Sequence, residues 1–128
     1  MLSNKSGSIA VTSSTAGKAG VPFSGTYTGS KHAIHGYFES LRTEKVSQVL
    51  NVQNSIETFQ VGSGVEICLL CPGPTFSDLL EVAATENPGE KFGESMRSTD
   101  KRMTSERCAE LSLIAIVNKL PESWICFR

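Results

Sequence analysis

The sequence contains no long hydrophobic run, no internal repeat and no low-complexity tract. No segment approaches the roughly 20 apolar residues that a membrane-spanning helix needs. The first residues, MLSNKSGSIAVTSS, contain no apolar core of signal-peptide length. We therefore expect nothing in these 128 residues to anchor the chain or export it. With 39% hydrophobic and 20% charged residues, the composition is that of one globular domain.

An excess of charge of either sign is also missing. The 12 lysines and arginines nearly balance the 13 acidic residues. Proteins that bind nucleic acid or anionic membranes usually carry a basic patch, and this balance provides none. The sequence therefore predicts no nucleic-acid partner, and no membrane contact is evident in it.

A second Cys-x-x-Cys pair is absent, which argues against a zinc site. Cys68 and Cys71 form one such pair inside the strand-like run VEICLLCPG, without the further ligands or the context that zinc and thioredoxin-like motifs require. We expect two reduced strand thiols and no metal. The two histidines, His32 and His35, are expected on the surface of a helix.

Strand-like and helix-like patterns alternate along the chain. Residues 8–13 predict a strand and then a loop, and residues 26–45 an amphipathic helix with apolar residues three and four apart. Residues 65–70 are almost continuously apolar, as in a parallel strand covered on both faces. A second helix is expected to begin near Thr104 with Ser105 as its cap, and WICFR could begin another strand.

Tyr27 and Lys31 lie four residues apart, on one face of the expected helix. Carbonyl reduction or alcohol oxidation with a nicotinamide needs a proton donor or acceptor at the reacting oxygen. A tyrosine can serve if a nearby ammonium stabilises its phenolate form. The hydroxyl of Ser14 could orient the substrate and stabilise developing charge. The Tyr-x-x-x-Lys spacing alone is weak, because it also arises by chance.

The context of that pair, SIAVTSSTAGKAGVPFSGTYTGSKHAIHGYFESLRTE, resembles the short-chain dehydrogenase/reductase family. That family has a strand that ends in Ser-Ser, a tyrosine thirteen residues after the second serine, and Ser-Lys-x-Ala on the following helix. Ser14, Tyr27 and Lys31 match these positions. The resemblance implies that Ser14 orients the substrate, Tyr27 transfers the proton and Lys31 assists Tyr27.

The resemblance continues at VEICLLCPGPTFSDLL, which is similar to the family's strand and Pro-Gly turn that passes the nicotinamide. Pro72 and Gly73 match that turn, and Ser77 matches a hydroxyl residue that commonly contacts the carboxamide. Together with Tyr27 and Lys31, these residues are the cofactor contacts that the resemblance implies. The cofactor would be NAD or NADP.

The resemblance implies an α/β fold, a partial Rossmann-like doubly wound parallel sheet. Residues 1–128 would form a single partial catalytic domain without the N-terminal nucleotide-binding βαβ unit. The family's glycine-rich pyrophosphate turn, catalytic asparagine and NAD- or NADP-selecting residue have no counterpart and are expected to precede Met1. Residues 45–64 stand where the family has a shorter loop, and are either a splice or gene-model insertion or a genuine surface extension. Residues 74–103 are expected to form a substrate lid.

Three hypotheses about function stay open. One is an NAD(P)-dependent oxidoreductase that interconverts a carbonyl and a secondary alcohol on an apolar substrate, such as a steroid, a retinoid or another lipid. Another is a truncated isoform, inactive on its own, that pairs with full-length subunits through the 26–45 helix, which often forms homo-oligomer interfaces in this family. The third is an incomplete gene model.

Three phrases, SKHAIHGYFESLRTE, CPGP and KRMTSERCAEL, are most similar to the dehydrogenase/reductase member-seven subgroup. Its better-known members are associated with the endoplasmic reticulum membrane. The resemblance leaves the location open between the cytoplasm and that membrane. It does not specify the substrate, the choice between NAD and NADP, or the direction of the reaction.

Overall fold

The computed structural model describes residues 6–50, 65–83, 87, 89–91 and 93–126. Strands and helices alternate along it, as the sequence predicts. The elements in chain order are strand β1 (Gly7–Thr12), 3-10 turn η1 (Thr15–Gly17), helix α1 (Gly25–Leu50), strand β2 (Val65–Pro72), helix α2 (Leu79–Val82), helix α3 (Ser105–Val117) and strand β3 (Glu122–Ile125).

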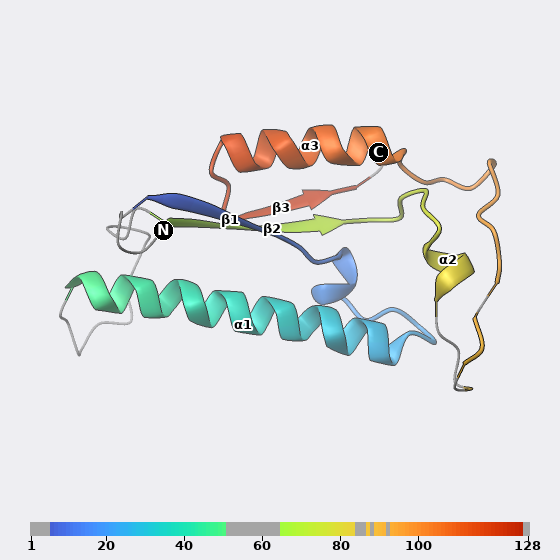
Figure 1. Cartoon of the computed structure of the whole chain (residues 1–128), viewed down its shortest axis with the longest axis horizontal. Helices are drawn as coiled ribbons and strands as arrows, with labels where there is room; N and C mark the ends of the chain where they lie inside the picture. Colours follow the sequence, from blue (N-terminus) through green and yellow to red (C-terminus); the bar gives the residue numbers. More distant parts are fainter. Residues whose placement is uncertain (1–5, 51–64, 84–86, 88, 92, 127–128) are drawn as a thin grey trace.

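The three strands form one parallel sheet in the order β1-β2-β3. Helices α1 and α3 cover opposite faces of this sheet, so the described chain has three layers (Figure 1). This architecture confirms the predicted α/β class. Among the described residues, β1 pairs only with β2, and its outer edge has no strand partner.

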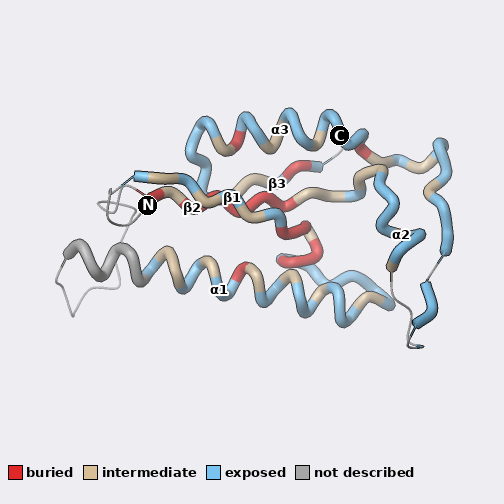
Figure 2. Tube along the Cα trace, viewed as in Figure 1, coloured by how far each residue is buried: buried red, intermediate tan, exposed pale blue. Residues whose placement is uncertain are grey.

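Strand β2 is the centre of the core. Leu69 and Cys71 are completely buried, and Cys68 is 1% exposed. Figure 2 shows the buried residues concentrated along β2 and in η1, whereas α1 and α3 are exposed on their outer sides. Because side chains alternate along a strand, Cys68 and Cys71 point to opposite faces of the sheet. Cys68 packs in a cluster with Leu70 and with Met103 ahead of α3, so the two thiols do not form a redox or zinc pair.

The two long helices differ from the sequence prediction at their ends. Helix α1 continues to Leu50, beyond the predicted end at Lys45, and residues 51–64 of the predicted insertion lie outside the described part. Helix α3 is capped by Thr104, whose hydroxyl accepts a hydrogen bond from the amide of Arg107 at 3.2 Å. The prediction of Ser105 as the cap is wrong, because its hydroxyl donates instead to the Phe76 carbonyl at 2.7 Å.

The chain between β2 and α3 leaves the sheet and returns to the same place. The amide of Met103 donates to the Pro74 carbonyl at 2.9 Å, and the amide of Phe76 donates to the Met103 carbonyl at 2.8 Å. These bonds fasten the two ends of the excursion beside the carboxyl end of β2. In the described part of the chain, no helix has the length and apolarity needed to cross a membrane.

Leu69→Ala is expected to destabilise the chain by about 3 kcal/mol, because it removes buried methyl groups and leaves a cavity in the central strand. Leu113→Ala, a control on the 62% exposed side chain of Leu113, is expected to cost less than about 0.5 kcal/mol. Urea unfolding followed by circular dichroism measures both values. Equal losses in the two variants would contradict a core centred on β2.

Candidate functional site

Ser14 lies just beyond the carboxyl end of β1. Its extended backbone, with φ −168° and ψ 162°, makes it the N-cap of η1, and its hydroxyl accepts a hydrogen bond from the Ala16 amide at 3.1 Å. The same hydroxyl donates to the Pro72 carbonyl at 3.3 Å, across from the end of β2. Ser14 is 9% exposed. The predicted orienting serine is therefore held in a turn that spans the ends of two strands.

Tyr27 and Lys31 lie in the first two turns of α1, which begins at Gly25. The Lys31 ammonium lies 5.6 Å from the centroid of the Tyr27 ring. It also lies 3.5 Å from the carbonyl of Thr12, the last residue of β1. The structure thus brings the predicted pair together beside the carboxyl end of β1. The start of α1 lies at the same end of the sheet as α2 (Figure 1).

Tyr27 forms part of the wall of a cleft of about 470 Å³. Leu79 and Leu80 of the predicted lid also line this cleft, which is mainly apolar. Its lining residues are Val21, Phe23, Ser24, Thr26, Tyr27, Leu79, Leu80 and Ala83. Ser14 is not among these lining residues. The cleft therefore presents one phenol within a mainly apolar surface.

Phe23 stands out in this cleft because its side chain is fully exposed, at 109%. Its φ of 58° is in the left-handed region, which residues other than glycine rarely adopt. An exposed aromatic ring on a strained backbone is unusual for a structural residue. Phe23 was not among the predicted site residues, although the apolar residues between Ser14 and Tyr27 were a signal that this loop could line a pocket.

Pro72 and Gly73 stand at the end of β2, close to Ser14 and to the end of β3. The Gly73 amide donates to the Ile125 carbonyl at 2.8 Å, which fixes the turn against β3. Ser77 is placed differently. Its hydroxyl accepts a hydrogen bond from the Leu79 amide at 3.3 Å, at the start of α2. Ser77 is not among the residues that line the Tyr27 cleft.

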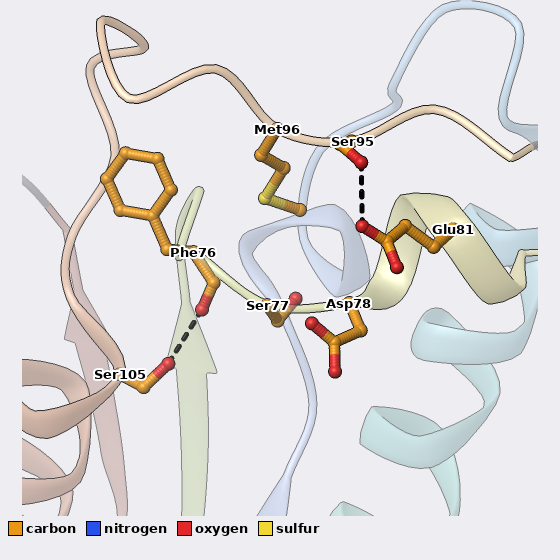
Figure 3. Close-up of a pocket in the computed structure, with 7 residues that line it drawn as sticks. All are labelled: Phe76, Ser77, Asp78, Glu81, Ser95, Met96 and Ser105. Atoms are coloured by element: carbon orange, nitrogen blue, oxygen red, sulfur yellow. Dashed lines mark hydrogen bonds between the residues drawn. The ribbon is translucent and has the colours of Figure 1, made fainter.

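Ser77 instead lines a second, more polar hollow of about 350 Å³. Figure 3 shows it beside Asp78, with Met96 above them and the Ser95 hydroxyl bonded to a Glu81 carboxylate oxygen at 2.7 Å. On the far side, the Ser105 hydroxyl meets the Phe76 carbonyl. In the described conformation, Ser77 therefore lines a different hollow from Tyr27.

His35 does not lie on the helix surface, so the prediction for it is wrong. It is only 4% exposed and lies between α1, η1 and β2. His32 is exposed, as predicted, and its Nδ1 lies 2.9 Å from the Thr28 carbonyl. The helical pattern did not reveal the burial of His35, because that burial depends on neighbours from other elements.

Comparison with known proteins places these features in a family. A family model described as short chain dehydrogenase matches residues 1–87. Dehydrogenase/reductase SDR family member 7 from Homo sapiens is 34% identical over 125 residues, which cover 98% of this chain and 32% of that protein. SDR family protein 7-like from Drosophila melanogaster is 28% identical over 123 residues, 95% of this chain and 32% of that protein.

A solved structure has the same fold. A short-chain dehydrogenase/reductase from Burkholderia phymatum, in complex with NAD, superimposes with a TM-score of 0.68 at 21% identity, over 100% of this chain and 45% of that one. The chain spans about a third of the length of the relatives it matches. Because the family model covers about two thirds of its residues, the chain belongs to the short-chain dehydrogenase/reductase family of oxidoreductases.

Proposed function

We propose that this chain supplies the catalytic part of an NAD(P)-dependent oxidoreductase that interconverts a carbonyl and a secondary alcohol on an apolar substrate. The observation that carries the proposal is the position of Tyr27 in the wall of an apolar cleft, with the Lys31 ammonium 5.6 Å from its ring. A mainly apolar cleft with one titratable hydroxyl is the expected form of a site for a steroid-like, retinoid-like or other lipid-like molecule.

The residues of this chain fit the nicotinamide and the ribose next to it, which are one part of the cofactor. An ammonium carries three hydrogen-bond donors, and the contact that the described residues give Lys31 Nζ is the long 3.5 Å approach to the Thr12 carbonyl. Donors of Lys31 therefore remain for ribose hydroxyls. Pro72 and Gly73 would contact the nicotinamide side. Ser77 would do so only if the start of α2 moved, because it lines the second hollow.

When bound, the nicotinamide supplies or accepts the hydride at the substrate carbon. Tyr27 Oη moves the proton to or from the substrate oxygen, and the Lys31 ammonium stabilises the phenolate form of Tyr27. Ser14 donates a hydrogen bond to the same oxygen. For this, its hydroxyl must turn away from the Pro72 carbonyl, to which it makes a long bond of 3.3 Å. That bond is weak enough to exchange.

The 74–103 segment would act as a lid over the substrate. Leu79 and Leu80 already face Tyr27 across the cleft. The fully exposed ring of Phe23 offers apolar surface that a bound substrate would cover. Closure of these groups would exclude water from the reacting oxygen, which strengthens the interaction between Lys31 and the phenolate.

The pyrophosphate of the cofactor needs a further unit. No glycine-rich turn between a strand and a helix is present in the part of the chain that the structure describes. The outer edge of β1, which has no partner among the described residues, is where a further parallel strand would pair. We propose that a nucleotide-binding half docks at that edge in the complete enzyme.

A second candidate function is assembly with a longer family member. Helix α1 presents an open face of small residues and one aromatic ring: Gly29, Ala33, Gly36 and Tyr37 are all exposed, and Tyr37 is 65% exposed. A Cβ placed on Gly29 or Gly36 would meet nothing within 4 Å. Such a face allows another helix to approach closely. The chain would then act as an inactive subunit that pairs with a full-length family member.

Tyr27→Phe is expected to reduce kcat by at least about 100-fold, because it removes the proton donor. Cofactor binding should change little, since one hydroxyl is lost. The measurement uses a polypeptide in which the nucleotide-binding half of a relative precedes Met1, assayed with apolar ketones and NADH or NADPH. Tyr37→Phe, on the same helix but outside the cleft, is the matched control. Turnover that survives Tyr27→Phe would refute the role of Tyr27.

The 128-residue chain by itself is expected to show no dehydrogenase activity and to bind NADH and NADPH at least about 100-fold more weakly than the longer polypeptide. Charge-assisted contacts to the pyrophosphate contribute several kcal/mol of binding free energy. Cofactor fluorescence titrations of both proteins measure this ratio. Equal affinities would show that these residues hold the whole cofactor.

If the chain assembles with a longer family member, affinity-tagged chain should retain that partner during purification from cells that express both. Ala33→Glu on the open face of α1 should reduce retention at least tenfold, because it places a charge in a close helix contact. Ala109→Glu, on an exposed position of α3, is the matched control. Equal retention of the two variants would exclude the α1 face as the interface.

A further inference from the structure

The buried ring of His35 supports the turn that carries Ser14. His35 lies one helical turn beyond Lys31 on α1, and Gly17 of η1 lies directly against its imidazole. A Cβ on Gly17 would come within 2.6 Å of His35 Cδ2 and 2.8 Å of Nε2. On another side, Nε2 lies 3.6 Å from the Cys71 thiol of β2. The ring therefore fills the space between α1, η1 and β2.

Charged groups surround this ring on one side. The Lys18 ammonium, directly after η1, pairs with Glu122 of β3 at 2.9 Å and with Glu39 of α1 at 3.0 Å. The same Glu122 oxygen lies 3.8 Å from His35 Nδ1, which has no hydrogen-bond partner within the described residues. The titratable and charged groups near the ring are His32 and Glu39 from α1, Lys18, Cys71 from β2 and Glu122 from β3.

The surroundings determine the protonation of this cluster. Burial raises the pKa of the Cys71 thiol to about 11, so the thiol stays protonated and can donate to Nε2. Burial lowers the pKa of His35, and the Lys18 ammonium lowers it further, against opposing effects of Glu122 and Glu39. With Nε2 as the acceptor, the proton of the neutral ring lies on Nδ1 and faces Glu122.

His35, Cys71 and Glu122 also bring three potential metal-ligand atoms within 4.8 Å of one another. However, the Lys18 ammonium already neutralises the Glu122 carboxylate. Burial raises the pKa of Cys71, which opposes the thiolate that a metal would require. The positive charge beside Glu122 is therefore the Lys18 ammonium of the chain itself. This arrangement favours a role in supporting η1 over metal binding.

We propose that neutral His35 is a positioning residue that holds η1, and with it the Ser14 hydroxyl, in place relative to Tyr27 and Lys31, and that protonation of its ring loosens this turn. The part of the proposal that concerns substrate rests on the proposed function, in which Ser14 orients the reacting oxygen. Protonation would place a buried cation beside Lys18 and remove the acceptor for the Cys71 thiol. The added proton would lie on Nε2, the ring atom that faces Cys71 and lies against Gly17.

The contact between ring and turn is tested by a double-mutant cycle on the 128-residue chain. Gly17→Ala should lower the melting temperature by at least about 5 °C, because its Cβ would lie 2.6 Å from His35 Cδ2 and 2.8 Å from the Ser13 hydroxyl, which can turn away more easily than the buried ring. Combined with His35→Ala, the same change should cost less than half as much. Gly20→Ala, in the same loop with nothing within 4 Å of its Cβ, is the matched control. Equal costs of Gly17→Ala in the two backgrounds would overturn the contact.

The effect of protonation is tested by melting the same chain between about pH 8 and pH 5.5. Since folding lowers the pKa of His35 from its ordinary 6.5, the stability that neutral His35 provides is present above pH 6.5. It is lost as the pH falls through the lowered value. The melting temperature of the wild type should therefore fall over this range by about 4 °C or more. His35→Gln should abolish most of that fall, and His32→Gln should preserve it.

Turnover distinguishes a positioning role from a purely structural one. In the longer polypeptide, kcat of the wild type should decrease as the pH is lowered below 6.5. In His35→Gln, kcat should stay constant over the same acid range, and the KM for the cofactor should be unchanged. At neutral pH, His35→Ala should lower kcat at least tenfold and His35→Gln should restore most of it.

The same decrease of kcat at acid pH in the wild type and in His35→Gln would overturn the positioning role. Absence of wild-type turnover would count against the proposed function alone, because the melting experiments still decide the contact and its protonation.

Discussion

The parallel pairing of β2 with both of its neighbours is the constraint on which the rest of the structure depends. β2 is the only described strand with partners on both edges, and its side chains are buried on both faces. The strand ends at Pro72, which has no amide hydrogen to continue the ladder. The Pro72 carbonyl accepts a hydrogen bond from the Ser14 hydroxyl, and the Gly73 amide donates one to the Ile125 carbonyl of β3. The same strand therefore supplies the core and fixes the end of the sheet where the site forms.

Parallel strands bring their carboxyl ends to one edge, and this edge gathers groups from distant parts of the sequence. Ser14 follows β1, Tyr27 lies in the first turn of the crossover helix α1, and Pro72 ends β2. Leu79 and Leu80 arrive from the excursion beyond β2 to close the cleft. A rigid sheet holds the polar groups, while loops provide the apolar surface. This division allows a family with one sheet to serve substrates of different shapes.

Local spacing in the sequence was enough to predict the alternation of strands and helices and the proximity of Tyr27 and Lys31, whereas the parallel Rossmann-like sheet was implied by the family resemblance. The first two follow from short-range periodicity, since a four-residue separation places two side chains on one helix face. The burial of His35 depends on Gly17, Cys71 and Glu122, which come from three other elements. No period along α1 encodes that arrangement. The cap of α3 was misassigned for a similar reason: Phe76, far away in sequence, takes the hydroxyl of Ser105.

The excursion between β2 and α3 is tied at its base by bonds between residues 74–76 and 103–105. Its ends therefore keep their positions whatever lies between them. Changes in the length or composition of the intervening segment would alter the wall opposite Tyr27 without disturbing strand register or the Ser14 turn. Evolution could in this way reshape the cleft beside Tyr27 while leaving the sheet and the stability of the fold almost untouched.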